Sequence, residues 1–198
     1  NTTAERNTAV GNSALIANTT GDNNTSIGAF ALDANTTADY NTAIGSSALT
    51  TNTTGANNTG LGTFALQNNT TASNNTAVGY FSLHGNTTGT NNVAVGSNAL
   101  DANTTGINNT AVGYLSLTSS TTASYNTAFG FHALEENLSD SNTGIGYAAL
   151  AANTTGTSSV ALGFAALTNN TTACCNTAVG YSSLSANTTG RQNVAIGN

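Results

Sequence analysis

The sequence predicts an all-β fold, a β-solenoid of about twelve coils of 17 residues, and three observations support it. First, a five-letter motif that ends in glycine, such as Asn7-Thr-Ala-Val-Gly11, recurs along the whole chain. Second, successive motif glycines lie 17 residues apart, except Gly130 and Gly146, which lie 16 apart. Third, the repeat is rich in Asn, Thr and Gly, which are weak helix formers. Helix-pair repeats also need about 33 residues or more, so a 17-residue unit suits a single β-coil.

The consensus unit is N-T-T-[GA]-x-x-N-[TV]-A-[VIL]-G-x-x-[AS]-L-x-x, and its positions are numbered here from 1 to 17. Units begin at residues 1, 18, 35, 52, 69, 86, 103, 120, 137, 153, 170 and 187. Because they fill the chain, residues 1–198 form a single repeat array without a domain boundary. We expect each coil to hold two or three short strands joined by tight turns, with coils about 4.8 Å apart.

Two apolar columns are expected to point into the coil. One is the leucine column at unit position 15, which runs without a break from Leu15 to Leu184. Small residues at Ala9 and Ala14 and their equivalents let opposite walls approach, and Gly11 and its equivalents suit a bend with positive φ. The other inward column is the aliphatic one at unit position 10: Val10, Ile27, Ile44, Leu61, Val78, Val95, Val112, Phe129, Ile145, Leu162, Val179 and Ile196.

Asparagine recurs at unit position 1 (Asn1, Asn18, Asn35) and at unit position 7 (Asn7, Asn24, Asn41). Stacked side-chain amides can bond from coil to coil, so both columns predict asparagine ladders. The alternative is N-glycosylation, because Asn18, Asn52 and Asn153 each begin an N-x-[ST] tripeptide.

Large apolar residues follow the motif glycine in two neighbouring columns. They either fill the interior or, because side chains alternate along a strand, place at least one column outside. An outward stripe marks an interaction surface, which predicts self-association. The termini consist of ordinary repeat letters, which fits a head-to-tail filament or a longer array. The stripe contains Phe30, Phe64, Tyr80, Phe81, Tyr114, Leu115, Phe131, Tyr147, Phe164 and Tyr181.

Composition argues against several classes of protein. The net charge is −6, and Arg6 and Arg191 are the only basic residues, which disfavours nucleic acid and anionic membrane surfaces as partners. No apolar run approaches the roughly 20 residues of a membrane span. His84 and His132 occupy different columns almost three coils apart, too far for a shared metal or proton relay, and are expected at the surface. The sequence predicts no enzyme, no catalytic residue, no cofactor and no metal site.

Two local irregularities leave alternatives open. The segment from Glu135 to Ser141 spans the 16-residue step and contains Glu135, Glu136 and Asp140, which fit either a solvated, shortened turn or a calcium site with oxygen ligands. Cys174 and Cys175 occupy variable columns. They are free thiols, a vicinal disulfide or a cross-link between chains, and the cross-link would require an oxidising compartment.

The motif copies Asn92-Val-Ala-Val-Gly96 and Asn193-Val-Ala-Ile-Gly197 resemble the head repeats of trimeric autotransporter adhesins and similar repeats of phage tail fibres. The resemblance extends over all twelve units, although the motif is short and degenerate. It implies a left-handed parallel β-roll, a homotrimer and an adhesive or fibrous role at a cell surface or on a virion. The unit here is longer than the usual head repeat by about the N-T-T segment, and no neck, heptad stalk or anchor is visible.

The leading functional prediction is a structural segment of an extracellular fibre or adhesin shaft that forms a trimer or filament. One alternative is ice binding through threonine columns that start at Thr2, Thr3 and Thr8, although Thr2 and Thr3 are adjacent and should point to opposite faces. Another is a glycan- or surface-binding module that uses the aromatic stripe.

Overall fold

The computed structural model describes residues 3–198 and confirms an all-β solenoid. Each coil contains one three-residue strand, and no helix occurs within these residues. The expectation of two or three strands per coil is wrong, because the rest of each coil consists of turns. The strands are β1 (Thr8–Val10), β2 (Thr25–Ile27), β3 (Thr42–Ile44), β4 (Thr59–Leu61), β5 (Thr76–Val78), β6 (Val93–Val95), β7 (Thr110–Val112), β8 (Thr127–Phe129), β9 (Thr143–Ile145), β10 (Val160–Leu162), β11 (Thr177–Val179) and β12 (Val194–Ile196).

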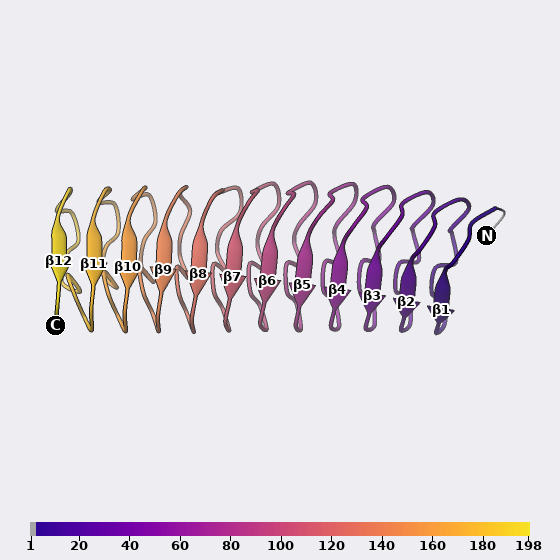
Figure 1. The fold of residues 1–198 in the computed structure, drawn as a ribbon, viewed down its shortest axis with the longest axis horizontal. Helices are drawn as coiled ribbons and strands as arrows, with labels where there is room; N and C mark the ends of the chain where they lie inside the picture. The colour runs from indigo at the N-terminus through magenta and orange to yellow at the C-terminus, as the bar shows by residue number, and fades with distance from the viewer. Residues whose placement is uncertain (1–2) are drawn as a thin grey trace.

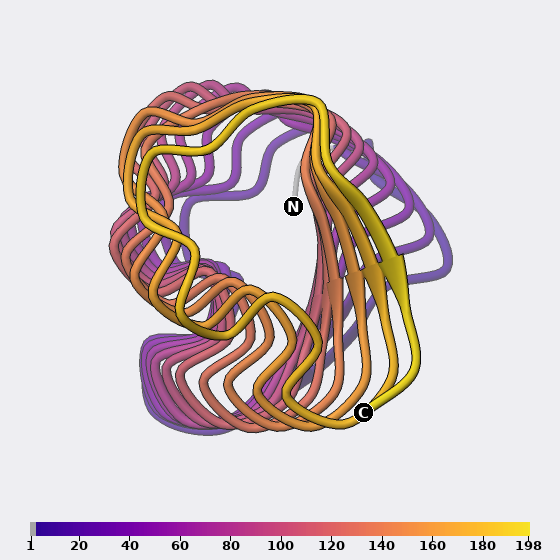
Figure 2. The same cartoon turned by 90° about the vertical axis from the view of Figure 1, so that its left-hand side faces the viewer.

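The strands form one parallel sheet in sequence order, so every coil pairs only with the coils before and after it. Thr8 lies opposite Thr25, and the register keeps this 17-residue offset except where Thr127 lies opposite Thr143. The coils stack into a rod with the two termini at opposite ends (Figure 1). Seen from the C-terminal end, the chain runs clockwise as it approaches the viewer (Figure 2), so the solenoid is left-handed.

Positive φ angles close each coil. In the fifth unit Asn74, Phe81 and Leu83 have φ of 62°, 53° and 50°, and Gly79 has φ of 132°. Unit positions 6, 13 and 15 repeat this left-handed conformation, which costs roughly 1–2 kcal/mol for an ordinary residue and least for Asn. Packing against equivalent coils on both sides offsets this cost. The left-handed residues interrupt the extended backbone, which explains why so little of each coil is strand.

The core is narrow and consists mainly of leucine and alanine. The leucine column from Leu32 to Leu167 is fully buried, and Leu184 packs against it half-buried. Alanines of unit positions 9 and 14, such as Ala94 and Ala99, are also fully buried. These inward predictions are confirmed.

The aliphatic column was predicted to point inward, and this prediction is wrong. The interior accepts the small residue at position 9, so the flanking positions 8 and 10 of the same strand must point outward. Val10 is 57% exposed, Phe129 56% and Leu162 44%. None of the residues in this column is buried in the core, and each is exposed or half-buried. The outward residues are Val10, Ile27, Ile44, Leu61, Val78, Val95, Val112, Phe129, Ile145, Leu162, Val179 and Ile196.

Both asparagine ladders are present inside the coil, and they are called here the first ladder, at unit position 1, and the second ladder, at unit position 7. At position 7, the Oδ1 atom of Asn75 accepts the Asn92 backbone N–H at 2.9 Å, and its Nδ2 atom donates to the Gly89 carbonyl at 2.9 Å. At position 1, Asn86 Nδ2 donates to Asn69 Oδ1 at 2.9 Å and to Gly89 at 3.0 Å. The ladder predicted at Asn1 lies outside the described residues.

Candidate interaction surface

The outward side of the sheet is a continuous uncharged surface, called here the sheet face. It consists of unit positions 8 and 10, so each strand contributes one Thr or Val and one large apolar residue. Position 8 is Thr in nine strands and Val in β6, β10 and β12. Since every strand carries the same pair, the sheet face presents two parallel rows along the whole rod.

The aromatic stripe lies outside the coil, beyond the bend that follows the sheet face. Phe30, Tyr80, Tyr114, Phe131, Tyr147, Phe164 and Tyr181 are exposed, and Phe64, Phe81 and Leu115 are half-buried. The structure therefore places none of these residues in the core, and it extends the apolar surface beyond the sheet face.

Five rings of this stripe stack into a ladder along the rod axis. Ring centroids are 5.4 Å apart from Tyr114 to Phe131, then 5.3, 4.9 and 5.0 Å through Tyr147 and Phe164 to Tyr181. The rings of the last three pairs are nearly parallel, with interplanar angles of 4° to 7°. The spacing follows from the coil repeat of about 4.8 Å, which holds equivalent rings at stacking distance.

This stacking turns the ring faces toward each other and the ring edges toward solvent. Sugars and cations bind to aromatic faces, so the inner rings of the ladder offer no such platform. A second cluster, formed by Phe64, Tyr80 and Phe81, is not stacked in this way. The ring centroids of Tyr80 and Phe81 are 4.4 Å apart in an edge-to-face arrangement, and those of Phe81 and Phe64 are 4.9 Å apart. The glycan-binding alternative is left with the rings of this second cluster and those at the ladder's ends.

The sheet face is the feature that sequence reasoning missed, although a signal was present. In Thr76-Ala-Val78 and its equivalents, the large residues are two apart and flank a small one, which is the pattern of a strand with two outward residues. Hydrophobicity alone does not imply burial, because apolar atoms contribute more than half of a typical protein surface.

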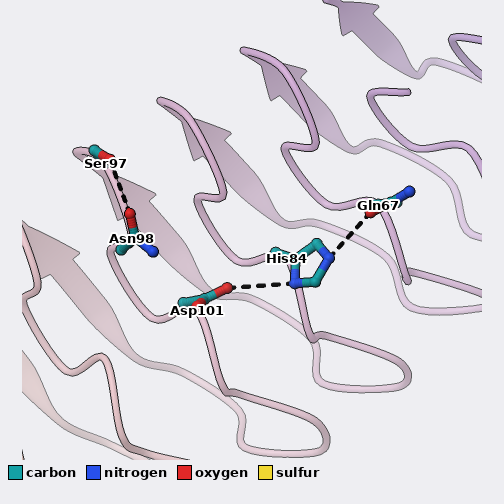
Figure 3. Close-up of polar contacts among 5 residues, drawn as sticks. All are labelled: Gln67, His84, Ser97, Asn98 and Asp101. Atoms are coloured by element: carbon teal, nitrogen blue, oxygen red, sulfur yellow. Dashed lines mark hydrogen bonds and ion pairs between the residues drawn. The ribbon is translucent and has the colours of Figure 1, made fainter. Parts of the chain in front are cut away.

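His84 lies in a polar chain that crosses three coils (Figure 3). Its Nε2 atom is 3.0 Å from Gln67 Oε1, and its Nδ1 atom is 3.4 Å from Asp101 Oδ1. Burial raises the pKa of Asp101, and the nearby His84 and Asn98 oppose that effect. His84 was expected at the surface and is half-buried; since the three residues are 17 apart, the period itself could have revealed their contact.

The other candidate sites predicted from the sequence lie apart from the polar contacts of His84. His132 contacts Glu135 within its own unit and is likewise half-buried. Asp140 of the 16-residue unit accepts the Ser124 backbone N–H at 2.8 Å, and Ser139 donates to the Gly156 carbonyl at 2.6 Å. These two hydrogen bonds connect the shortened turn to the coil before it and to the coil after it.

Cys174 is half-buried and Cys175 is exposed, and both are free thiols. The hydrogen bond with Cys174 is the main cause that raises the pKa of Cys175. Because both thiols are free, the vicinal disulfide is not formed in this structure, whereas the cross-link between chains stays a prediction.

The first ladder is interrupted at Ser120, which occupies an asparagine position. The Oδ1 atom of Asn103 and the Oγ atom of Ser120 are buried without a hydrogen-bond partner among residues 3–198. A buried unsatisfied polar group costs about 1–3 kcal/mol. We expect Ser120→Asn to supply an amide to Asn103 and to raise the unfolding free energy by about 1–2 kcal/mol, measured by urea denaturation.

A matched control exists in the second ladder. Ser159 also replaces an asparagine, but its Oγ atom already accepts the Asn176 backbone N–H at 3.3 Å. Ser159→Asn should therefore gain less than Ser120→Asn. An equal or larger gain at Ser159 would contradict this account of the interruption.

Within residues 3–198, no pocket and no cluster of three or more potential metal ligands is found. The same part of the chain contains no helix long and apolar enough to cross a membrane. Comparisons with protein-family models, with curated proteins and with solved structures find no match.

Proposed function

We propose that this chain is a structural segment of an extracellular fibre or adhesin shaft that self-associates through its sheet face. The observation that carries the proposal is the outward pair on each of the twelve strands, a Thr or Val followed two residues later by a large apolar residue. Exposed apolar surface of this extent and regularity is typical of an interaction site.

A second copy of the chain is the partner that fits this surface best. Its own sheet face repeats every coil at the same spacing of about 4.8 Å, so rows of side chains can interdigitate along the full rod. The sheet face carries no charged residue, so pairing two of them brings no like charges together. Three copies around a common axis, as in the repeats that the motif resembles, would cover the sheet face of each.

The interior supports a mechanical role. Every coil is joined to the next by backbone bonds, such as Thr76 N–H to Asn92 carbonyl at 2.9 Å, and most coils are also joined by two buried amide ladders. Such bonds lie along the rod axis, so an axial load is shared by several hydrogen bonds at each step.

Charge placed on the sheet face tests the proposal. We expect the natural chain to sediment as an oligomer and the double variant Val95→Lys/Val112→Lys to sediment as a monomer with unchanged circular dichroism. Burial of uncompensated charge is costly, and both valines point outward on neighbouring strands.

The matched control places the same charges on the same two coils at exposed threonines. Thr88→Lys/Thr105→Lys should sediment like the natural chain, because these residues lie at the N-T-T corner. A natural chain that stays monomeric over the accessible concentration range would overturn the proposal.

Ice binding is a second candidate, favoured by the outward threonine row at position 8. Thr25, Thr42, Thr59 and Thr76 succeed one another on adjacent strands, with an aliphatic side chain two residues on. Regular rows of this kind can order water. Thermal hysteresis of the natural chain, measured at concentrations where it is monomeric, decides between the two, since self-association would cover the same face.

A further inference from the structure

We infer that three exposed asparagines, Asn57, Asn74 and Asn108, are acceptor sites for N-linked sugars on the folded rod. Each occupies unit position 6 and begins an Asn-Asn-Thr tripeptide, which matches the N-x-T acceptor pattern. The hydroxyl residues are Thr59, Thr76 and Thr110, the first residues of β4, β5 and β7.

Burial or hydrogen bonding distinguishes these acceptors from the other N-x-T tripeptides of residues 3–198. Asn23, Asn68 and Asn187 are half-buried, and Asn169 is exposed but its Nδ2 atom donates to the Ser185 carbonyl at 2.9 Å. Asn52, Asn86 and Asn103 also match the pattern, but their side chains are fully buried and bonded in the first ladder. In contrast, the side chains of Asn57, Asn74 and Asn108 are exposed. Within residues 3–198, no side-chain hydrogen bond occupies their amides.

The backbone holds the three amides at a turn. Their φ angles are 59°, 62° and 57°, a left-handed conformation that Asn tolerates better than other non-glycine residues. The turn projects each side chain from the coil just before the strand begins. The fold thus explains why Asn stands there, and the same geometry makes its amide accessible to a transferase.

The array also contains a natural comparison. Asn91 lies in the same column, is exposed and has φ of 59°, but Val93 stands where the other units have Thr. Asn91 differs from Asn74 in lacking the hydroxyl two residues on, and its Nδ2 atom also donates to Thr90 Oγ1 at 3.4 Å, so it should not accept a sugar.

The chemistry is transfer of a hexose from a nucleotide-activated donor. The bond between the anomeric carbon and the diphosphate oxygen breaks, and the diphosphate leaves with the electron pair. Asparagine Nδ2 forms the new bond to carbon and gives up one proton to a base of the transferase. The acceptor amides lie before the strand, but their hydroxyl partners Thr59, Thr76 and Thr110 belong to the sheet face, so the inference concerns the folded chain before self-association covers that face.

The test treats the folded chain, at concentrations where it is monomeric, with a soluble N-glycosyltransferase and its nucleotide-activated hexose, followed by mass mapping of peptides. We expect one hexose at each of Asn57, Asn74 and Asn108, and none at Asn52, Asn86 or Asn91. Thr76→Val should abolish the hexose at Asn74, and Val93→Thr should create one at Asn91. Both substitutions exchange residues that the array already uses at position 8, so the fold is retained.

Three results would overturn the inference. They are a folded chain left unmodified while a free Asn-Asn-Thr peptide reacts in the same mixture, a hexose on a buried ladder asparagine, and a Val93→Thr variant that gains nothing at Asn91.

Discussion

Gly96→Ala is expected to break the solenoid at its middle, with a loss of at least about 4 kcal/mol. Gly96 has φ of 136°, a conformation open almost only to glycine. An added Cβ would also lie 2.5 Å from the carbonyl oxygen of Gly113 in the next coil. Since that oxygen belongs to the backbone, relief requires the two coils to separate.

The response should be local as well as large. Each coil contacts only its neighbours, so one failed step divides the array into two shorter stacks. We expect hydrogen exchange at Ala94 and Ala111 to accelerate, and urea unfolding to lose its single cooperative transition.

Gly60→Ala is the matched control. Gly60 lies in β4 opposite Ala43 and Ala77, and its added Cβ would lie 3.2 Å from the Ala65 carbonyl oxygen. Position 9 normally holds alanine, so the change should cost less than about 1 kcal/mol. Equal damage from both variants would contradict the role assigned to the bend glycines.

Leu100→Ala is expected to destabilise the isolated chain by about 2–5 kcal/mol, whereas Val95→Ala should cost less than about 1 kcal/mol. Both residues lie on the same coil, but Leu100 is fully buried and Val95 lies on the outward sheet face. Truncating Leu100 leaves a cavity in a closely packed interior. Truncating Val95 removes atoms that already contact solvent.

Urea unfolding at concentrations where the chain is monomeric measures this difference. Sedimentation at higher concentration should reverse the order, because the folded fraction of Leu100→Ala keeps its sheet face intact and Val95→Ala does not. If Val95→Ala proved as costly as Leu100→Ala in the monomer, the outward assignment of the aliphatic column would be wrong.

The sequence predicted most of the architecture because a period fixes which residues meet. Residues 17 apart, such as Asn69 and Asn86, must stack when each unit makes one coil, so the parallel pairing, leucine column and ladders could be predicted. The same rule would have paired His84 with Asp101.

What the sequence alone determined is therefore the order along the rod: one coil per unit, strands in register and like residues above one another. What only the tertiary structure decided is which side chains of each coil point into the core and which point toward solvent. Val95 and Leu100 are both aliphatic, yet one faces solvent and the other the core. The left-handed turns at Asn98 and Leu100 set how wide the interior is, and that width admits Ala94 rather than Val95. Side-chain polarity does not encode this choice, because it depends on where the opposite wall of the coil lies.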